Sequence, residues 1–298
     1  AFEAFLNTIV KAGDVEFADE IFRSFFLSNI LQKSSSISFQ IRSARRHGRL
    51  LPKTRHFNIL LGGYSKAYQL VESKKSKAIV SKNTTKSDDL KVSRAYDLLT
   101  IMIRMVPLDG FSITSIMALP FASSEKITAL LQRIEPEMTV HLNAAAYRSI
   151  ITAFGKAGDP SSALWMAEEM IQSCRNQGRN VESWNVVLGA LARCDNDEYT
   201  LDILNSSAAL ARRNAKSQAN DDSENQFISL VDGSTCLDAS MAILDTMRNG
   251  VMLPEGYRAP KPNSQTYCLV ASCMSQSSSS SETSKSNAKR ALALFGTA

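Results

Sequence analysis

The sequence predicts an all-α fold, an α-solenoid or superhelix of stacked helix-turn-helix repeats with long loop insertions. Three observations lead to this prediction. Apolar residues recur at helical spacing in many segments. The stretch 147–170 contains two such segments joined by a short Lys-Ala-Gly turn. Variants of that pair recur from one end of the chain to the other, which is the signature of a repeat architecture.

The first helix of the stretch 147–170 carries an apolar stripe, and a proline-containing turn starts the second. The stripe residues are Tyr147, Ile150, Ile151 and Phe154. Gly158 is expected to end the first helix, while Asp159 and Pro160 supply an N-cap and a first-turn residue for the second. Apolar residues of the second helix follow at Ala163, Met166, Ala167 and Met170. Neither helix can bury its stripe alone, so the hairpin needs similar hairpins beside it.

Five first helices open on an aromatic residue that we expect to be buried between helices. These residues are Phe2, Phe57, Tyr147, Trp184 and Tyr267. The matching second helices share a small residue, which allows close approach of neighbouring helices, at Ala18, Ala95, Ala163, Ser240 and Ala291. The Lys-Ala-Gly turn at 11–13 repeats the turn at 156–158 at the same distance from the aromatic.

These units resemble the pentatricopeptide repeat (PPR), a helix-turn-helix of about 35 residues. The resemblance is carried by the aromatic-Asn openings at 57–58 and 184–185. It is also carried by late methionines at Met102, Met170 and Met247, and by closing pairs at Pro52-Lys53 and Pro262-Asn263. The resemblance implies a helical array that binds single-stranded RNA, with each repeat reading one nucleotide.

The expected repeats are 1–53, 54–143, 144–180, 181–263 and 264–298, with disordered insertions at 69–91, 214–232 and 275–286. Residues 106–142 form a further spacer, in which a short helix can begin near Ile127. In the fourth repeat, two segments compete as the partner of the helix at 184–193, namely 237–249 and the helical pattern that starts at Leu201. The chain starts without methionine and inside a helix pattern, and we therefore interpret it as a fragment.

The resemblance also implies which residues read bases: the residue after each opening aromatic, together with the residue that closes the repeat. This rule pairs Asn185 with Asn263, Asn58 with Asn143, Arg148 with Asn180, and Glu3 with Lys53. Asparagine offers both a donor and an acceptor to a base edge. The alternative for each asparagine is capping of the first helical turn.

Basic residues recur where each first helix is expected to end, at Lys11, Lys66, Lys156 and Arg193. By the resemblance this place faces the groove, where a cation can meet phosphate. The alternative is a favourable interaction with the dipole at the helix C-terminus. Residues 42–94 carry 14 basic and 3 acidic residues, a composition that favours binding of a polyanion. The alternative is a solvated insertion that binds no ligand.

No catalytic or metal-binding constellation is present, so we predict no enzyme activity, no cofactor and no metal. The histidines, His47, His56 and His141, fit no nucleophile or ligand spacing. The five cysteines are scattered, and Cys268 with Cys273 lacks a second pair. No apolar run has the length of a membrane span, and we expect no membrane partner.

The predicted partner is single-stranded RNA, and the predicted role is organellar RNA processing, stability or translation, in a mitochondrion or chloroplast by the resemblance. One alternative is a protein-binding scaffold like the tetratricopeptide repeats, although Trp184 is followed by Asn-Val-Val, which departs from their Trp-x2-Leu-Gly spacing. A second alternative is a structural component of an organellar ribonucleoprotein, with other ribonucleoprotein proteins as partners.

Overall fold

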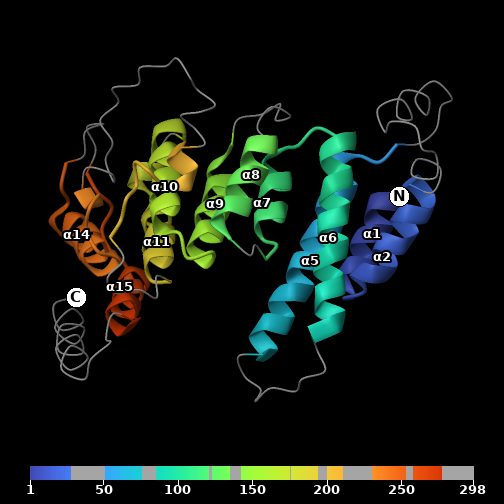
Figure 1. Ribbon diagram of the computed structural model, residues 1–298, viewed down its shortest axis with the longest axis horizontal. Coiled ribbons are helices and arrows are strands. Elements are labelled where there is room, and N and C mark those ends of the chain that lie inside the picture. The colour runs from blue at the N-terminus through green and yellow to red at the C-terminus, as the bar shows by residue number, and fades with distance from the viewer. Residues whose placement is uncertain are drawn as a thin grey trace. The chain divides into compact units, whose positions relative to one another are not determined.

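The computed structural model describes residues 1–27, 51–75, 85–120, 123–134, 142–174, 176–193, 200–210, 230–252 and 258–276. Every named element in these ranges is a helix, which confirms the all-α fold (Figure 1). Two isolated β-bridges, Thr200 with Thr235 and Met252 with Arg258, tie loops together. The chain forms two compact units, residues 1–120 with 133–142 and residues 121–132 with 143–298, and each is considered by itself.

The first unit begins with the predicted hairpin. Helix α1 (Phe2–Lys11) and helix α2 (Val15–Phe22) are joined by a turn in which Gly13 adopts φ +93°, and α2 continues into the π-helical turn η1 (Arg23–Leu27). A left-handed residue ends a helix at low cost only when it is glycine. The Asp14 side chain then accepts a hydrogen bond from the Phe17 amide and caps α2.

A second, longer hairpin follows in the same unit, formed by α5 (Thr54–Lys75) and α6 (Thr85–Met105). Both helices extend into the insertion that was predicted to be disordered at 69–91, so that prediction is wrong for 69–75 and 85–91. Residues 76–84 lie outside the described part. The buried Asp19 of α2 binds this hairpin: its carboxylate accepts hydrogen bonds from Arg23 and, at 2.9 Å, from the Tyr64 hydroxyl of α5.

Helix α7 (Gly110–Met117) packs against α5 and was not predicted. Asp109 and Ser112 form a reciprocal capping box that starts it. Residues 106–120 are therefore not a plain spacer. The predicted short helix near Ile127 is confirmed as α8 (Ser124–Ile134), which belongs to the second unit from residue 124 to residue 132.

The second unit contains the hairpin of α9 (Ala144–Lys156) and α10 (Pro160–Ser173), joined at Gly158 with φ +74°. The 3-10 turn η3 (Gln177–Arg179) leads into α11 (Val181–Leu191). Helix α14 (Cys236–Asn249) packs against α11, and both contact α15 (Ser264–Gln276). The pairing of 184–193 with 237–249 is thus the one that forms.

The segment that starts at Leu201 is not the partner helix of α11 and instead contacts α8 and α10. Ser207 forms hydrogen bonds with Ser162 at the start of α10 and with Thr128 of α8. Leu201, Ile203 and Val231 are buried, so the part of the 214–232 insertion from residue 230 onward is ordered, contrary to the prediction. Residues 211–229 and the predicted insertion and helix after residue 276 lie outside the described part.

Small residues bring successive first helices close together at two equivalent places. A Cβ atom on Gly155 of α9 would lie 2.8 Å from the Ala190 backbone of α11. In the first unit, a Cβ on Gly63 of α5 would lie 2.7 Å from the side chain of Val10 in α1. Each contact requires one partner without a side chain, which fixes how closely the hairpins stack.

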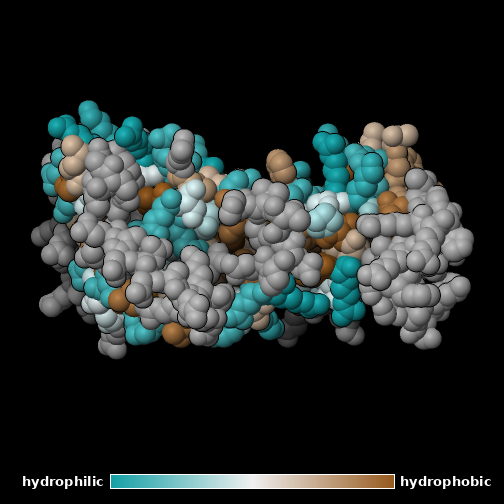
Figure 2. All heavy atoms as spheres, turned by 90° about the horizontal axis from the view of Figure 1, so that it is seen from above, coloured by the Kyte–Doolittle hydropathy of each residue, from teal (hydrophilic) through white to brown (hydrophobic). Residues whose placement is uncertain are grey.

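Three of the five opening aromatics are buried as predicted: Phe57, Tyr147 and Trp184. Phe2 and Tyr267 are only half-buried, because in the described residues α1 and α15 each have a first helix packed on one side only. Phe2 stacks on Phe25 with ring centroids 4.8 Å apart. The side chains of Phe5, Phe17 and Phe25 are about half exposed. Figure 2 shows hydrophobic residues at the surface of the end of the molecule that carries α1 and α2.

Candidate nucleic-acid interface

First helices lie next to one another within each unit: α1, α5 and α7 in the first, and α9, α11 and α15 in the second. We call the residue after each opening aromatic the reading residue, and the residue just before each first helix the closing residue. Successive first helices bring the reading residue of one hairpin toward the closing residue before the next.

The predicted pair Asn185 and Asn263 is in contact. The Asn185 Nδ2 donates a hydrogen bond to Asn263 Oδ1 at 3.2 Å, and a longer one of 3.5 Å to Gln265 Oε1. The Asn185 Oδ1 accepts from the Thr266 hydroxyl at 2.7 Å. Asn185 is only 3% exposed, so its amide is held in one orientation, whereas Asn263 is exposed.

Asn58, which the sequence analysis pairs with Asn143, contacts Asp109 in the structure. The Asn58 Nδ2 donates to Asp109 Oδ1 at 3.3 Å, a contact nearly the same as that between Asn185 and Asn263. The Asn58 Oδ1 is buried and has no hydrogen-bond partner in the part of the chain that the structure describes. The prediction missed Asp109 because helix α7, whose start it caps, was not expected. The Asp109–Ser112 spacing was the available signal.

Closing residues also cap the helix that follows. In each case the closing residue's Oδ1 accepts a hydrogen bond from a backbone N–H of the first helical turn. The pairs are Asn143 with Ala146, Asn180 with Glu182, Asp109 with Ser112, and Asn263 with Thr266. The capping alternative is therefore correct for these residues. Capping uses one oxygen, and no hydrogen bond within the described residues engages Nδ2 of these asparagines or Oδ2 of the aspartate, so these atoms are available to a ligand.

Charged reading residues are instead bound within the protein. The Arg148 Nη1 donates to Glu182 Oε2 of α11 at 3.0 Å. Glu3 lies 3.6 Å from the Arg55 guanidinium of α5. At the same junction the Lys53 amide donates to His56 Nδ1 at 3.0 Å, and the Glu3 carboxylate lies 3.8 Å from His56 Nε2.

His56 is buried among phenylalanine rings, and its imidazole stacks on Phe26 with centroids 5.1 Å apart. Burial lowers the pKa of His56, since the charged form loses its hydration; Glu3 acts in the opposite direction and Lys53 reinforces the shift. The neutral form is also required for Nδ1 to accept the Lys53 N–H bond.

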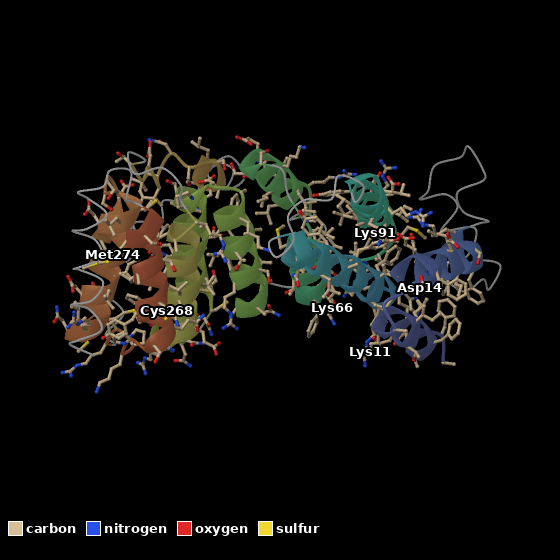
Figure 3. The ribbon with its side chains drawn as sticks, turned by 90° about the horizontal axis from the view of Figure 1, so that it is seen from below. Lys11, Asp14, Lys66, Lys91, Cys268 and Met274 are labelled. Atoms are coloured by element: carbon tan, nitrogen blue, oxygen red, sulfur yellow. The ribbon has the colours of Figure 1, made fainter. Side chains whose placement is uncertain are left out.

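The four predicted phosphate-contacting residues are all exposed. Lys11 and Lys156 are the last residues of α1 and α9, as expected. Lys66 lies inside α5 rather than at its end, so the helix dipole does not account for it. Figure 3 shows Lys11 and Lys66 on the side of the first unit formed by α1 and α5. The Arg193 Nη1 donates to the carbonyl of Gly189, which is the alternative expected for a helix end.

Phe111 is a surface aromatic that the sequence reasoning missed. It is the second residue of α7, two positions after Asp109, and its side chain is 74% exposed. Exposed aromatic rings are the usual stacking surfaces for single-stranded bases. Its position beside a capping aspartate was the signal that could have identified it.

Within the described residues, no group of three or more His, Cys, Asp or Glu side chains is arranged to hold a metal ion. Cys268 is exposed and Cys273 is buried in α15, and neither forms a disulfide with another cysteine of the described residues. Among the helices in the described ranges, none has the length and apolar character required to cross a membrane.

Comparison with known proteins gives one family match. The family model described as PPR repeat matches residues 145–174, which are the α9–α10 hairpin. A search of curated proteins gave no match. The matched hairpin and the stacked helix pairs around it together support a helical solenoid.

Proposed function

We propose that this chain belongs to the pentatricopeptide repeat family, whose repeat model matches residues 145–174, and that it binds single-stranded RNA across its first helices. Proteins of that family typically bind RNA and are generally not enzymes. We propose the same for this chain, with no cofactor and with a role in organellar RNA processing, stability or translation, in a mitochondrion or chloroplast.

The observation that carries the proposal is the repeated contact between a reading asparagine and a closing residue. Asn58 with Asp109 and Asn185 with Asn263 form it at 3.3 and 3.2 Å in separate units. Helix capping accounts for the closing residue of each pair, but not for the asparagine that donates to it. In an RNA-reading array, each such pair faces one base.

The two pairs differ in what they offer to that base. The Asn58 Oδ1 is buried, whereas the Asp109 Oδ2 accepts no hydrogen bond from the described residues, so this pair offers the carboxylate oxygen as an acceptor and suits a base edge with an N–H group. The exposed Asn263 Nδ2 offers a donor and suits a base edge with an acceptor. We therefore propose that the two hairpins prefer different bases.

The remaining predicted residues supply general affinity. Lys11, Lys66 and Lys156 are exposed and suited to phosphate, while Arg193 contributes less because it is engaged with its own helix. Asn143 and Asn180 present Nδ2 groups in the way Asn263 does. The exposed ring of Phe111 is proposed as a stacking surface.

A second candidate, a structural component of an organellar ribonucleoprotein, is favoured by the charged junctions. The reading residues Glu3 and Arg148 are bound to Arg55 and Glu182. Hairpins with such reading residues suit a protein that contacts RNA without reading it at every place. A protein-binding scaffold of the tetratricopeptide type is the third candidate.

The testing experiment measures binding of labelled single-stranded RNA over a salt series, followed by selection from randomised RNA. Binding should weaken steeply with salt, because each phosphate contact releases counterions. Lys156→Gln should reduce the salt slope by about one contact. Lys126→Gln, which removes an exposed lysine of α8, is the matched control and should not change it.

Salt-independent binding, or preferential binding of peptides, would favour the scaffold. RNA binding without base preference at any nucleotide would favour the structural component. Asn185→Ala should remove the preference at one nucleotide and leave overall affinity nearly unchanged. A misplaced base costs on the order of 1 kcal/mol, which is readily detected in such a selection.

A further inference from the structure

We call the place where one first helix meets the next a junction, and four junctions lie within a single unit. At three of them, the second residue of the later helix contacts the reading residue of the earlier helix. The contacts are Glu3 with Arg55 at 3.6 Å, Arg148 with Glu182 at 3.0 Å, and Asn185 with Gln265 at 3.5 Å. At the fourth junction, after Asn58, the second residue is Phe111, whose side chain has no polar group.

We propose that Glu182 is a negative determinant of RNA binding, which holds the Arg148 guanidinium away from RNA until this ion pair opens. The inference deepens the proposed function and rests on it. It assigns Glu182, a residue outside the predicted reading and closing residues, a role in setting how many hairpins contact RNA.

The reversed polarity of the two charged junctions supports this role. In the first unit the reading residue is the acid and its partner the base, whereas in the second unit the reading residue is the base and its partner the acid. When a charged residue contacts a base or a phosphate directly, the sign of its charge determines whether the contact is favourable. What the two junctions share is neutralisation of the reading residue, so neutralisation is the property that matters.

The geometry allows the pair to open. The Arg148 side chain is 29% exposed and the Glu182 side chain 70% exposed, and one hydrogen bond joins them. Exposed pairs of this kind are weak, and guanidinium groups bind phosphate with two parallel hydrogen bonds. RNA phosphate can therefore compete for Arg148. Glu182 also adds negative charge to the surface along which a polyanion would pass.

The test compares RNA affinity and its salt dependence for four variants of the whole chain, using a labelled mixed-sequence single-stranded RNA. Glu182→Gln should bind about two- to fivefold more tightly than the unaltered chain, because Arg148 becomes available. Its salt slope should increase by about one phosphate contact. Arg148→Gln supplies the single-variant reference, and combining it with Glu182→Gln should remove the gain that Glu182→Gln gives alone.

Asp245→Asn controls for net charge, since it removes one exposed carboxylate from α14. An equal gain from this variant, or a gain that persists in the double variant, would overturn the inference while leaving RNA binding established. Failure of the unaltered chain and every variant to bind RNA at low salt would instead reject the proposed function, and the inference with it.

Discussion

The Thr266 hydroxyl donates a 2.7 Å hydrogen bond to the Oδ1 of Asn185, a residue 81 positions earlier in the chain. Thr266 is fully buried, and its oxygen also accepts the Asn263 N–H at 3.1 Å. One hydroxyl therefore fixes both members of the proposed base-reading pair, the amide of Asn185 and the backbone of Asn263.

Thr266→Val should weaken this junction, because it leaves the Asn185 Oδ1 and the Asn263 N–H without a partner at nearly unchanged side-chain volume. Each unsatisfied buried group costs about 1–3 kcal/mol, so a clear loss of stability is expected in denaturant titration. Thr266→Ser keeps the hydroxyl and should retain most of the stability. If the valine and serine variants are equally stable, the hydroxyl does not hold the pair.

Asp109→Asn should change base preference and leave stability nearly unchanged. Aspartate and asparagine are about equally good N-caps, so α7 should remain capped. The free head-group atom changes from an acceptor to a donor, which should shift the preferred base at one nucleotide in a selection from randomised RNA. An unchanged preference would mean that Asp109 only caps the helix.

Gly155→Ala should destabilise the packing of α9 on α11, since the new Cβ would lie 2.8 Å from the Ala190 backbone. Overpacking of this kind typically costs about 1–3 kcal/mol. Gly62→Ala is the matched control, because it also lies inside a first helix and its Cβ would meet nothing within 4 Å. That control should be neutral or slightly stabilising, as measured by thermal unfolding.

Stability should fall as pH decreases below the ordinary histidine pKa of 6.5, in part because of His56. The pKa of His56 is lowered in the folded state, so between that lowered pKa and 6.5 the unfolded chain binds the extra proton. The contribution is complete above pH 6.5 and is lost as pH falls through this range. Glu3, Lys53 and Arg55 are the charged groups around the imidazole.

His56→Gln removes the titrating group and keeps an acceptor for the Lys53 N–H. Its unfolding midpoint should therefore depend less on pH than that of the unaltered chain between pH 5 and pH 6.5. Identical pH profiles for the two proteins would show that other groups account for the acid sensitivity.

The sequence was sufficient to predict the parts of the fold that depend on local chemistry. Glycine was required at positions 13 and 158 by their left-handed backbone, and both turns form as the Lys-Ala-Gly pattern indicated. For α11 the sequence left two partner segments open; the structure selects α14, in which the small residue Ser240 and the late Met247 are buried.

Other features depended on contacts that no periodicity shows. Helix α7 is short and apolar on several sides, so FSITSIM gives no clear stripe, and with it the closing role of Asp109 was missed. The ion pair of Arg148 with Glu182 depends on how two helices meet across a junction, which a single sequence does not reveal.

The closing residues are both helix caps and candidate base contacts, and this restricts which substitutions can change the base specificity of the array. A substitution at position 109, 143, 180 or 263 changes a candidate base contact and a helix cap at the same time. Replacing a capping residue with an aliphatic one costs about 1 kcal/mol, so the usable substitutions are mainly aspartate, asparagine, serine and threonine. Helix capping thus limits these positions to four residue types, and a new base specificity must be obtained with one of those four.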